Sequence, residues 1–229
     1  MEILSIIPAR GGSIQIPRKN LVKIRNKPLI YYTINASLKS SLITRTVVST
    51  DDREITTIAR KLGAEVIQRP KRLAGNKTQL EPVLLHILKY LEKNEKYNPK
   101  LITLLQPTSP MRNFKHIDES IKFFHKGKYD SVLSGYNSHH FFWQKKGNIA
   151  IPKNYNPKKR PNRQDKKCQF IENGAIYLTK VNLFKKNKTR LSGRIGLYEM
   201  PEKLSVDIDS KDDFQFVKQI MEKQNFLSI

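Results

Sequence analysis

Alternation between short apolar runs and longer amphipathic stretches constrains the fold of this chain most. Five runs rich in Ile, Val and Leu have the length and composition of buried strands: 2–7, 45–49, 65–68, 101–105 and 131–134. Four stretches with helical spacing separate them: 29–38, 53–62, 82–91 and 117–124. Nearly continuous apolar strands that alternate with helices are typical of parallel sheets covered on both faces. The sequence therefore predicts an α/β fold with a mostly parallel sheet.

This regular pattern breaks after Gly135. Residues 136–172 contain several aromatic side chains and then the proline- and cation-rich stretch "PKNYNPKKRPNRQDKK", which has no clean period. Such a stretch is either a flexible insertion or an arm that a partner orders. Regular pattern returns at 175–178, and a final helix is expected at about 211–223. We therefore expect one domain over 1–229, with 136–172 as an inserted arm.

Helix-boundary residues support these assignments. Pro28 suits the first position of the helix 29–38, and Gly63 suits the end of the helix 53–62.

Hydropathy and cysteine content limit the cellular compartments in which the protein is expected. Of the 229 residues, 38% are hydrophobic, and no apolar run approaches the roughly 18–20 residues that a membrane span needs. The N-terminus has no basic region or small-residue cleavage site of a signal peptide. The single cysteine, Cys168, cannot form an internal disulfide. We expect a cytoplasmic protein with no membrane partner.

A formal charge of +23 raises the alternative of a basic nucleic-acid-binding protein. The cations are spread along the whole chain instead of being clustered, and most are lysines. Such a distribution favours a solvated surface, and its field would also attract an anionic small substrate. We therefore expect no nucleic-acid partner, although tight, salt-sensitive binding to DNA or RNA without turnover would indicate one.

A loop with two glycines and three cations, "PARGGSIQIPRKN", follows the first expected strand. Ligands of open parallel sheets bind beyond the carboxyl ends of the strands, where this loop lies. Gly11 and Gly12 let backbone N–H groups approach a phosphate, and Arg10 and Lys19 supply charge. The loop contains neither a P-loop nor a dinucleotide-binding motif. It predicts a polyphosphate site, and an ordinary turn with solvated cations is the alternative.

Two aspartates near the C-terminus, in "DID" at 207–209, could bind a metal. If the segment is extended, Asp207 and Asp209 share one face and Ile208 points to the core. Two carboxylates on one face suit Mg²⁺. Alternatively, these acids interact with the dipole of the final helix, together with Asp212 and Asp213. We expect Asp207 and Asp209 to bind metal, and Asp212 and Asp213 to belong to the helix start.

Several blocks of the sequence resemble the signature of the CMP–sialic acid synthetases, also called acylneuraminate cytidylyltransferases. The blocks occur in the order of that family and span nearly the whole chain: "PARGGS…IPRKN", "VVSTDD", "GAEVIQRP", "LLQPTSP", "YDSVLS", "RPNRQD", "ENGAIY" and "LSVDIDSKDDF". Together the blocks indicate this family specifically, whereas any one block alone would be weak evidence for it.

The resemblance implies a Rossmann-like nucleotidyltransferase fold and a cytidylyltransferase reaction. The anomeric hydroxyl of an acidic nine-carbon sugar, a nonulosonic acid, would attack the α-phosphate of CTP with Mg²⁺ as cofactor, and pyrophosphate would leave. The resemblance also implies that the arm crosses to a second subunit of a homodimer and helps to close its sugar site. A cytidylyltransferase for the eight-carbon sugar Kdo is the alternative within the fold, although "RQD" with "ENGAIY" favours nine-carbon acids.

The resemblance also implies roles for particular residues. Matches to positions that bind the nucleotide are Ala9, Arg10, Gly11, Gly12, Ser13, Lys19, Asn20 and Arg69. Matches to sugar-site positions are Gln106, Arg163, Asn173 and Tyr177. Matches to metal-binding positions are Asp207 and Asp209, and the residues expected to act in catalysis are Arg10, Lys19 and Asp209. An arginine at position 163 suits the substrate, because a guanidinium binds a carboxylate through two hydrogen bonds.

The chain departs from the family at the phosphate loop. The family usually reads Gly-Ser-Lys-Gly, whereas this chain has Ile14 and Gln15 in place of the lysine and the second glycine. If position 15 requires a positive φ, Gln15 is strained by about 1 kcal/mol or more. Alternatively, Ile14 packs against a neighbouring element and the loop is re-optimised. Asn76 also replaces a common aspartate. An inactive relative that keeps the fold is therefore a further alternative.

Overall fold

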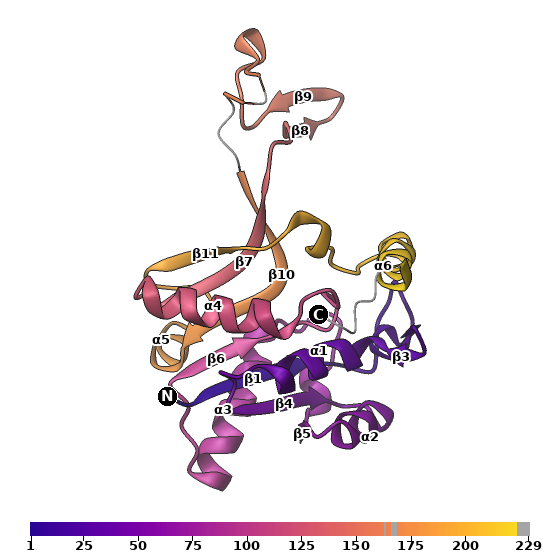
Figure 1. The fold of residues 1–229 in the computed structure, drawn as a ribbon, viewed down its shortest axis with the longest axis vertical. Coiled ribbons are helices and arrows are strands. Elements are labelled where there is room, and N and C mark those ends of the chain that lie inside the picture. Colours follow the sequence, from indigo (N-terminus) through magenta and orange to yellow (C-terminus); the bar gives the residue numbers. More distant parts are fainter. Residues whose placement is uncertain (163, 166–168, 224–229) are drawn as a thin grey trace.

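A seven-stranded sheet forms the centre of the computed structural model, which describes residues 1–162, 164–165 and 169–223 (Figure 1). Its strands, in spatial order, are β11 (Ile195–Glu199), β7 (Ser131–Ser138), β10 (Gln169–Lys180), β6 (Leu101–Leu104), β1 (Ile3–Pro8), β4 (Arg45–Thr50) and β5 (Glu65–Gln68). Strand β10 runs antiparallel to both neighbours, and the other pairings of this sheet are parallel. The predicted α/β fold with a mostly parallel sheet is confirmed.

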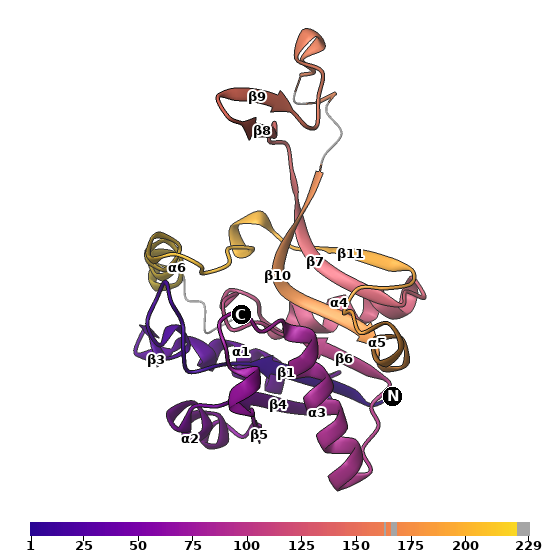
Figure 2. The same ribbon diagram turned by 180° about the vertical axis from the view of Figure 1, so that it is seen from behind.

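Helices cover both faces of the sheet (Figures 1 and 2). One face carries α1 (Leu29–Lys39), α2 (Arg53–Lys61) and α4 (Phe114–Lys126); the other carries α3 (Leu80–Glu95) and α5 (Val181–Asn187). Alternate side chains of β1 explain the arrangement, because Ile7 packs with the first group and Ile6 with the second. A strand buried on both faces is expected to be nearly all apolar, which accounts for Ile3, Leu4, Ile6 and Ile7; the one polar residue among them, Ser5, accepts a hydrogen bond from Ser37.

Helix boundaries follow local chemistry. Asp52 caps α2 by accepting hydrogen bonds from the N–H groups of Glu54 (2.8 Å) and Ile55 (3.0 Å). Gly63 follows the end of α2 with φ of +93°, as predicted for a glycine at a helix end. The prediction for Pro28 was one position off: it is the N-cap of α1, and the helix starts at Leu29.

A third, smaller core lies beyond the carboxyl end of β1. The loop after β1 leads through a short 3-10 turn (Lys19–Leu21) into the hairpin β2 (Lys23–Ile24) and β3 (Lys27–Pro28), and Ile24 packs with Val217 and Met221 of α6 (Lys211–Lys223). Figure 1 shows α6 beside β3, away from the sheet. This packing brings the C-terminal part of the chain to the ligand-binding edge of the sheet.

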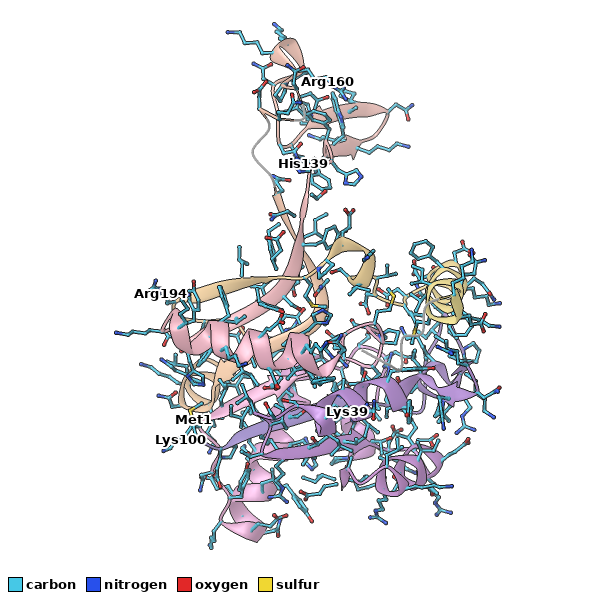
Figure 3. The ribbon with its side chains drawn as sticks, viewed as in Figure 1. Met1, Lys39, Lys100, His139, Arg160 and Arg194 are labelled. Carbon is cyan, nitrogen blue, oxygen red and sulfur yellow. The ribbon has the colours of Figure 1, made fainter. Side chains whose placement is uncertain are left out.

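The inserted region projects from the sheet as an arm (Figure 1). Strands β7 and β10 continue out of the sheet as an antiparallel pair, and β8 (Trp143–Lys146) pairs with β9 (Ile149–Pro152) near the end of the arm. Figure 3 places His139 at the base of this hairpin and Arg160 near the tip. The arm therefore has more regular structure than its aperiodic sequence indicates.

Within the described residues, no helix is both long and apolar enough to cross a membrane.

Candidate active site

A pocket of about 270 Å³ opens at the carboxyl ends of β1, β5 and β6. It is lined by the loop after β1, the segment 73–83, the turn after β6 and the aspartates that precede α6. Its lining residues are Pro8, Arg10, Gly12, Ser13, Lys19, Asn20, Arg69, Leu73, Gly75, Asn76, Thr78, Leu80, Val83, Gln106, Pro107, Thr108, Asp207 and Asp209. Most of the predicted nucleotide and metal residues thus meet in one place.

Arg10 lines this pocket and connects two of its lining segments. Its Nη1 donates a hydrogen bond to the carbonyl oxygen of Gly75 (2.9 Å), which links the loop after β1 to the segment that follows β5. Asn20 holds the backbone of Arg10, because its amide donates to the Arg10 carbonyl oxygen (2.9 Å). Asn20 therefore supports the loop from within as well as lining the pocket.

The two glycines of the loop differ in what surrounds them. A Cβ on Gly11 would lie 2.7 Å from Asp52 Oδ2, and the Gly11 N–H donates to Asp51 Oδ1 (3.0 Å). Gly11 is thus a glycine because Asp52 approaches it, and its N–H is already used. A Cβ on Gly12 would meet nothing within 4 Å. Gly12 and Ser13 line the pocket, whereas Ala9 is buried and its N–H donates to the Ser49 carbonyl oxygen.

The structure contradicts both expectations for the altered part of the loop. Gln15 does not have a positive φ, so no strain of that kind exists there; the positive φ in this loop belongs to Arg18 (+53°). Ile14 is 72% exposed, so it does not pack against a neighbouring element. Arg18 is instead a loop anchor, because its guanidinium pairs with Asp52 and Glu54 of the α2 start, each at 3.0 Å.

Lys19 joins the loop to the aspartate segment. Its Nζ donates to the Ile208 carbonyl oxygen (2.7 Å) and lies 3.4 Å from Asp209 Oδ1. Ile208 is fully buried, while Asp207 and Asp209 both line the pocket, as the alternation of an extended segment predicts. Asp213 accepts bonds from Ser210 at the start of α6, so it belongs to the helix cap as predicted.

The two carboxylates differ in their surroundings. Burial raises the pKa of the Asp207 carboxyl, and the charge of Asp209 adds to that shift. Asp207 Oδ1 is buried and has no hydrogen-bond partner within the described residues, whereas the Asp209 side chain is 71% exposed. A buried carboxylate oxygen without a donor suits a cation ligand.

A metal ion at this site would need ligands from the substrate. In the part of the chain that the structure describes, no three His, Cys, Asp or Glu side chains come together in a metal-binding arrangement. Mg²⁺ is commonly held by one or two carboxylates together with substrate phosphates and water. The pair Asp207 and Asp209 therefore fits Mg²⁺ in company with a triphosphate.

Arg69 forms part of the floor of the pocket near β4. Its Nε and Nη2 donate to the hydroxyl (3.2 Å) and carbonyl (2.8 Å) oxygens of Ser49. Burial lowers the pKa of the Arg69 guanidinium to about 10, and Asp51 opposes that shift. The Arg69 side chain is therefore fixed by internal hydrogen bonds where it lines the pocket.

Gln106 and an irregular stretch of β10 form the wall next to Asp207. The pairing register of β10 shifts between Glu172 and Tyr177, and Gly174 there has φ of +69°. A Cβ on Gly174 would lie 3.4 Å from both Asp207 Oδ2 and Gln106 Oε1. The glycine thus lets the strand run against two pocket side chains.

We expect Gly174→Ala to lower kcat/KM for the reaction of this pocket. The substitution strains the backbone by about 1–2 kcal/mol and places a methyl group between Asp207 and Gln106. Gly147→Ala is the matched control, since Gly147 also has a positive φ (+59°) but nothing lies within 4 Å of its Cβ position. The melting temperature should fall in both variants, whereas kcat/KM should fall only in Gly174→Ala. Equal kcat/KM in both variants would contradict the placement of Gly174.

The residues predicted for the sugar site do not all lie in the pocket. Gln106 lines the pocket. Asn173 is buried, and its amide bonds Ser134 and Ser205, while the Tyr177 hydroxyl donates to the Glu172 carboxylate. Neither is among the lining residues of the pocket, so the structure gives both a supporting place, and contact with a sugar stays a prediction. Arg163 lies outside the described residues.

Sequence reasoning missed several lining residues, among them Gly75, Thr78 and Val83. Asn76 was noted only as a departure. The segment 73–83 has no motif of its own, and the contact that reveals it, from Arg10 to the Gly75 carbonyl oxygen, joins residues 65 positions apart.

An α/β sheet with a cationic pocket and two carboxylates at its carboxyl edge is the arrangement of a nucleotidyltransferase-like protein. The chain resembles two solved structures in fold: a CMP:2-keto-3-deoxy-manno-octonic acid synthetase complexed with CTP (TM-score 0.71, 16% identity, covering 97% of this chain and 99% of the other) and a 4-diphosphocytidyl-2C-methyl-D-erythritol synthase from Anaerococcus prevotii (TM-score 0.68, 12% identity, 96% and 98%).

Sequence comparison is more specific. The profile of the family described as Cytidylyltransferase matches residues 4–229, and the chain belongs to this family. It is 34% identical over 223 residues to N-acylneuraminate cytidylyltransferase A of Danio rerio, and the matched region covers 95% of this chain and 50% of that protein. It is 31% identical over 233 residues to the N-acylneuraminate cytidylyltransferase of Escherichia coli, covering 98% and 53%. The chain thus spans about half the length of the curated relatives it matches.

Proposed function

We propose that this chain transfers CMP from CTP to the anomeric hydroxyl of a nonulosonic acid and releases pyrophosphate. The observation that carries the proposal is the convergence of Arg10, Lys19, Asp207 and Asp209 on one pocket of a cytidylyltransferase fold. The names of the relatives support a sialic-type acceptor. Their cytidylyltransferase chemistry also supports an active protein over an inactive relative. The CTP substrate and the single cysteine favour a cytoplasmic location.

Charge neutralisation and positioning would do most of the catalytic work. Arg10 and Lys19 would bind the triphosphate and stabilise the charge that develops as pyrophosphate leaves. Asp207 and Asp209 would hold Mg²⁺, which lowers the cost of negative charge on the transferred phosphate when bound. Arg69 would face the cytosine end of CTP, and Gln106 the sugar.

A pyrophosphate-release assay tests the proposal. The chain is incubated with CTP, Mg²⁺ and, separately, sialic, legionaminic, pseudaminic and Kdo acids. Release with a nine-carbon acid and none with Kdo is the expected result. Release only with Kdo would support the eight-carbon alternative. The absence of release with every acid, while CTP still binds, would support the inactive relative and overturn the proposal.

We also propose that the chain forms a homodimer through the arm. Near the tip, β8 and β9 expose apolar side chains, with Trp143 at 47% and Ile149 at 69% exposure. Phe141, Trp143 and Tyr155 pack together there, and Arg160 lies 4.2 Å from the ring centroid of Phe141. A projecting arm with an apolar, aromatic end suits burial against a second copy of the chain.

Sedimentation analysis of Ile149→Asp tests this association. We expect a dimer for the wild type and a monomer for the variant, because burying an unpaired carboxylate in an apolar interface is costly. Ile195→Asp is the control: Ile195 is an exposed isoleucine (45%) on β11 of the central sheet, and this variant should remain dimeric. A dimeric Ile149→Asp variant or a monomeric wild type would contradict the role of the arm.

We expect Ile14→Lys to increase kcat/KM for CTP by a few-fold. Ile14 is exposed beside the pocket-lining Gly12 and Ser13, so a lysine there adds a cation without displacing packed atoms. Gln15→Gly is the comparison; it should bring no gain, because Gln15 has no positive φ to relieve. Initial rates at varied CTP concentration measure both. An unchanged or lower kcat/KM for Ile14→Lys would show that a cation at position 14 does not reach the triphosphate.

A further inference from the structure

Behind the pocket lies a fully buried arginine that the reaction as described does not use. Arg112 is 1% exposed and directly precedes Asn113, the N-cap of α4. Its Nε and Nη2 have no hydrogen-bond partner within the described residues, where no carboxylate lies within ion-pair distance of it. A buried, incompletely paired cation is costly to fold, so its presence calls for a compensating role.

The one guanidinium nitrogen that is bonded connects two walls of the pocket. Nη1 of Arg112 donates to the carbonyl oxygens of Gln106 (3.2 Å) and Ala175 (3.1 Å). Gln106 begins the turn after β6, and Ala175 lies in the irregular part of β10 beside Gly174. Arg112 therefore joins the turn to the strand from behind the pocket.

The aspartate segment is coupled to the same place. The N–H of Ile208 donates to the Thr108 carbonyl oxygen (2.9 Å), which ties the segment to the turn after β6. Burial lowers the pKa of Arg112 to about 9, and the negative charge of Asp207 opposes this shift, so the two groups interact electrostatically. Asp207 Oδ1 is itself buried without a partner in the described part of the chain. Arg112 and Asp207 thus interact through their charges without forming an ion pair, and the turn after β6 links them through hydrogen bonds.

We propose that Arg112 is a positioning residue that sets the relative placement of Gln106 and Asp207. Its hydrogen bonds fix the turn and the strand, the turn holds the aspartate segment through the bond from the Ile208 N–H to the Thr108 carbonyl oxygen, and the charge of Arg112 attracts the Asp207 carboxylate. The inference deepens the proposed function and rests on it for the identity of the reaction. A purely structural arginine would affect stability alone, whereas a positioning arginine would also change turnover and metal-dependent binding.

The test compares three variants of the full chain with the wild type. Arg112→Met should lower kcat by about tenfold to a hundredfold and change KM for CTP by no more than about twofold, since the lost contacts lie behind the pocket. Arg112→Lys should recover most of kcat, because an ammonium can still donate to both carbonyls and keep the charge. Arg45→Met is the control: Arg45 pairs with Glu65 and Glu95 at the amino end of β4 and should lose stability without losing kcat.

Binding provides a second measurement that does not depend on turnover. Calorimetry of CTP with and without Mg²⁺ gives the metal-dependent part of the affinity, which should shrink in Arg112→Met and persist in Arg45→Met. If the wild type turns over no acid, the proposed function fails, and this comparison still decides the role of Arg112.

Two results would overturn the inference. One is a folded Arg112→Met variant with wild-type kcat and wild-type Mg²⁺ dependence. The other is a kcat loss in Arg45→Met as large as that in Arg112→Met. If Arg112→Met does not fold, Arg112→Gln replaces it, with a low kcat expected for Gln and a nearly wild-type kcat for Lys. Equal kcat in Gln and Lys variants would then overturn the role of the charge.

Discussion

Asp209→Asn is expected to lower turnover by about a hundredfold to a thousandfold while leaving the fold intact, because it removes one of two carboxylate charges that would hold Mg²⁺ at the transferred phosphate. The Asp209 side chain is 71% exposed, so the isosteric amide leaves the core unaltered. Lys19 should keep its stronger hydrogen bond, to the Ile208 carbonyl oxygen. The loss should therefore appear in kcat and in the Mg²⁺ concentration that gives half-maximal rate.

Asp212→Asn is the matched control for this prediction. Asp212 is an exposed carboxylate only three positions away, but it lies in the first turn of α6 and does not line the pocket. It should retain the wild-type rate at every Mg²⁺ concentration. If Asp209→Asn kept most of its activity at limiting Mg²⁺, Asp209 would not be a metal ligand.

Lys19→Met is expected to have the second large effect, a fall in kcat/KM for CTP of about a hundredfold to a thousandfold. The substitution removes a cation that would bind the triphosphate and also breaks the 2.7 Å bond that holds the Ile208 carbonyl oxygen. The two losses act on the same transition state, because the carbonyl belongs to the segment that carries both aspartates. Steady-state kinetics at saturating sugar measure the change.

Lys23→Met separates the local role of Lys19 from the general positive field of the protein. Lys23 is exposed on β2, a few residues further along the same chain segment, and does not line the pocket. Its loss should change kcat/KM for CTP by less than about twofold at physiological salt, where exposed charges are screened. Comparable losses in the two variants would indicate steering by net charge and not a contact.

The strands and helices of the sheet could be predicted because the signals for them lie within short stretches of the sequence. Strand β1 is buried on both faces, so its sequence is apolar except at Ser5, whose hydroxyl accepts a hydrogen bond from Ser37. Asp52 and Gly63 mark the two ends of α2 by their own backbone chemistry. The antiparallel direction of β10 and its irregular stretch had no such signal. They depend on contacts such as the Asn173 amide with Ser134 and Ser205, which join residues 39 and 32 positions apart.

The candidate site also has features that could be predicted from the sequence and features that could not. Alternation along 207–209 predicts that both aspartates share a face, and the structure has both in the pocket. The reasoning about Gln15 was wrong, because a substitution at a glycine position of a family loop does not by itself show that the backbone there has a positive φ. Arg112 was missed because a lone arginine after "QPTSPM" looks like a surface cation until its burial is known.

Isotope tracing shows whether the anomeric oxygen of the acceptor itself attacks the α-phosphate of CTP, as we propose. The nonulosonic acid that is active in the pyrophosphate assay is labelled with oxygen-18 at the anomeric hydroxyl, and the nucleotide product is analysed by mass spectrometry and ³¹P NMR. We expect a CMP-sugar that retains the label in the bridge between sugar and phosphorus, formed in equal amount to pyrophosphate. Unlabelled CMP as the nucleotide product, or a CMP-sugar without the label in that bridge, would contradict it.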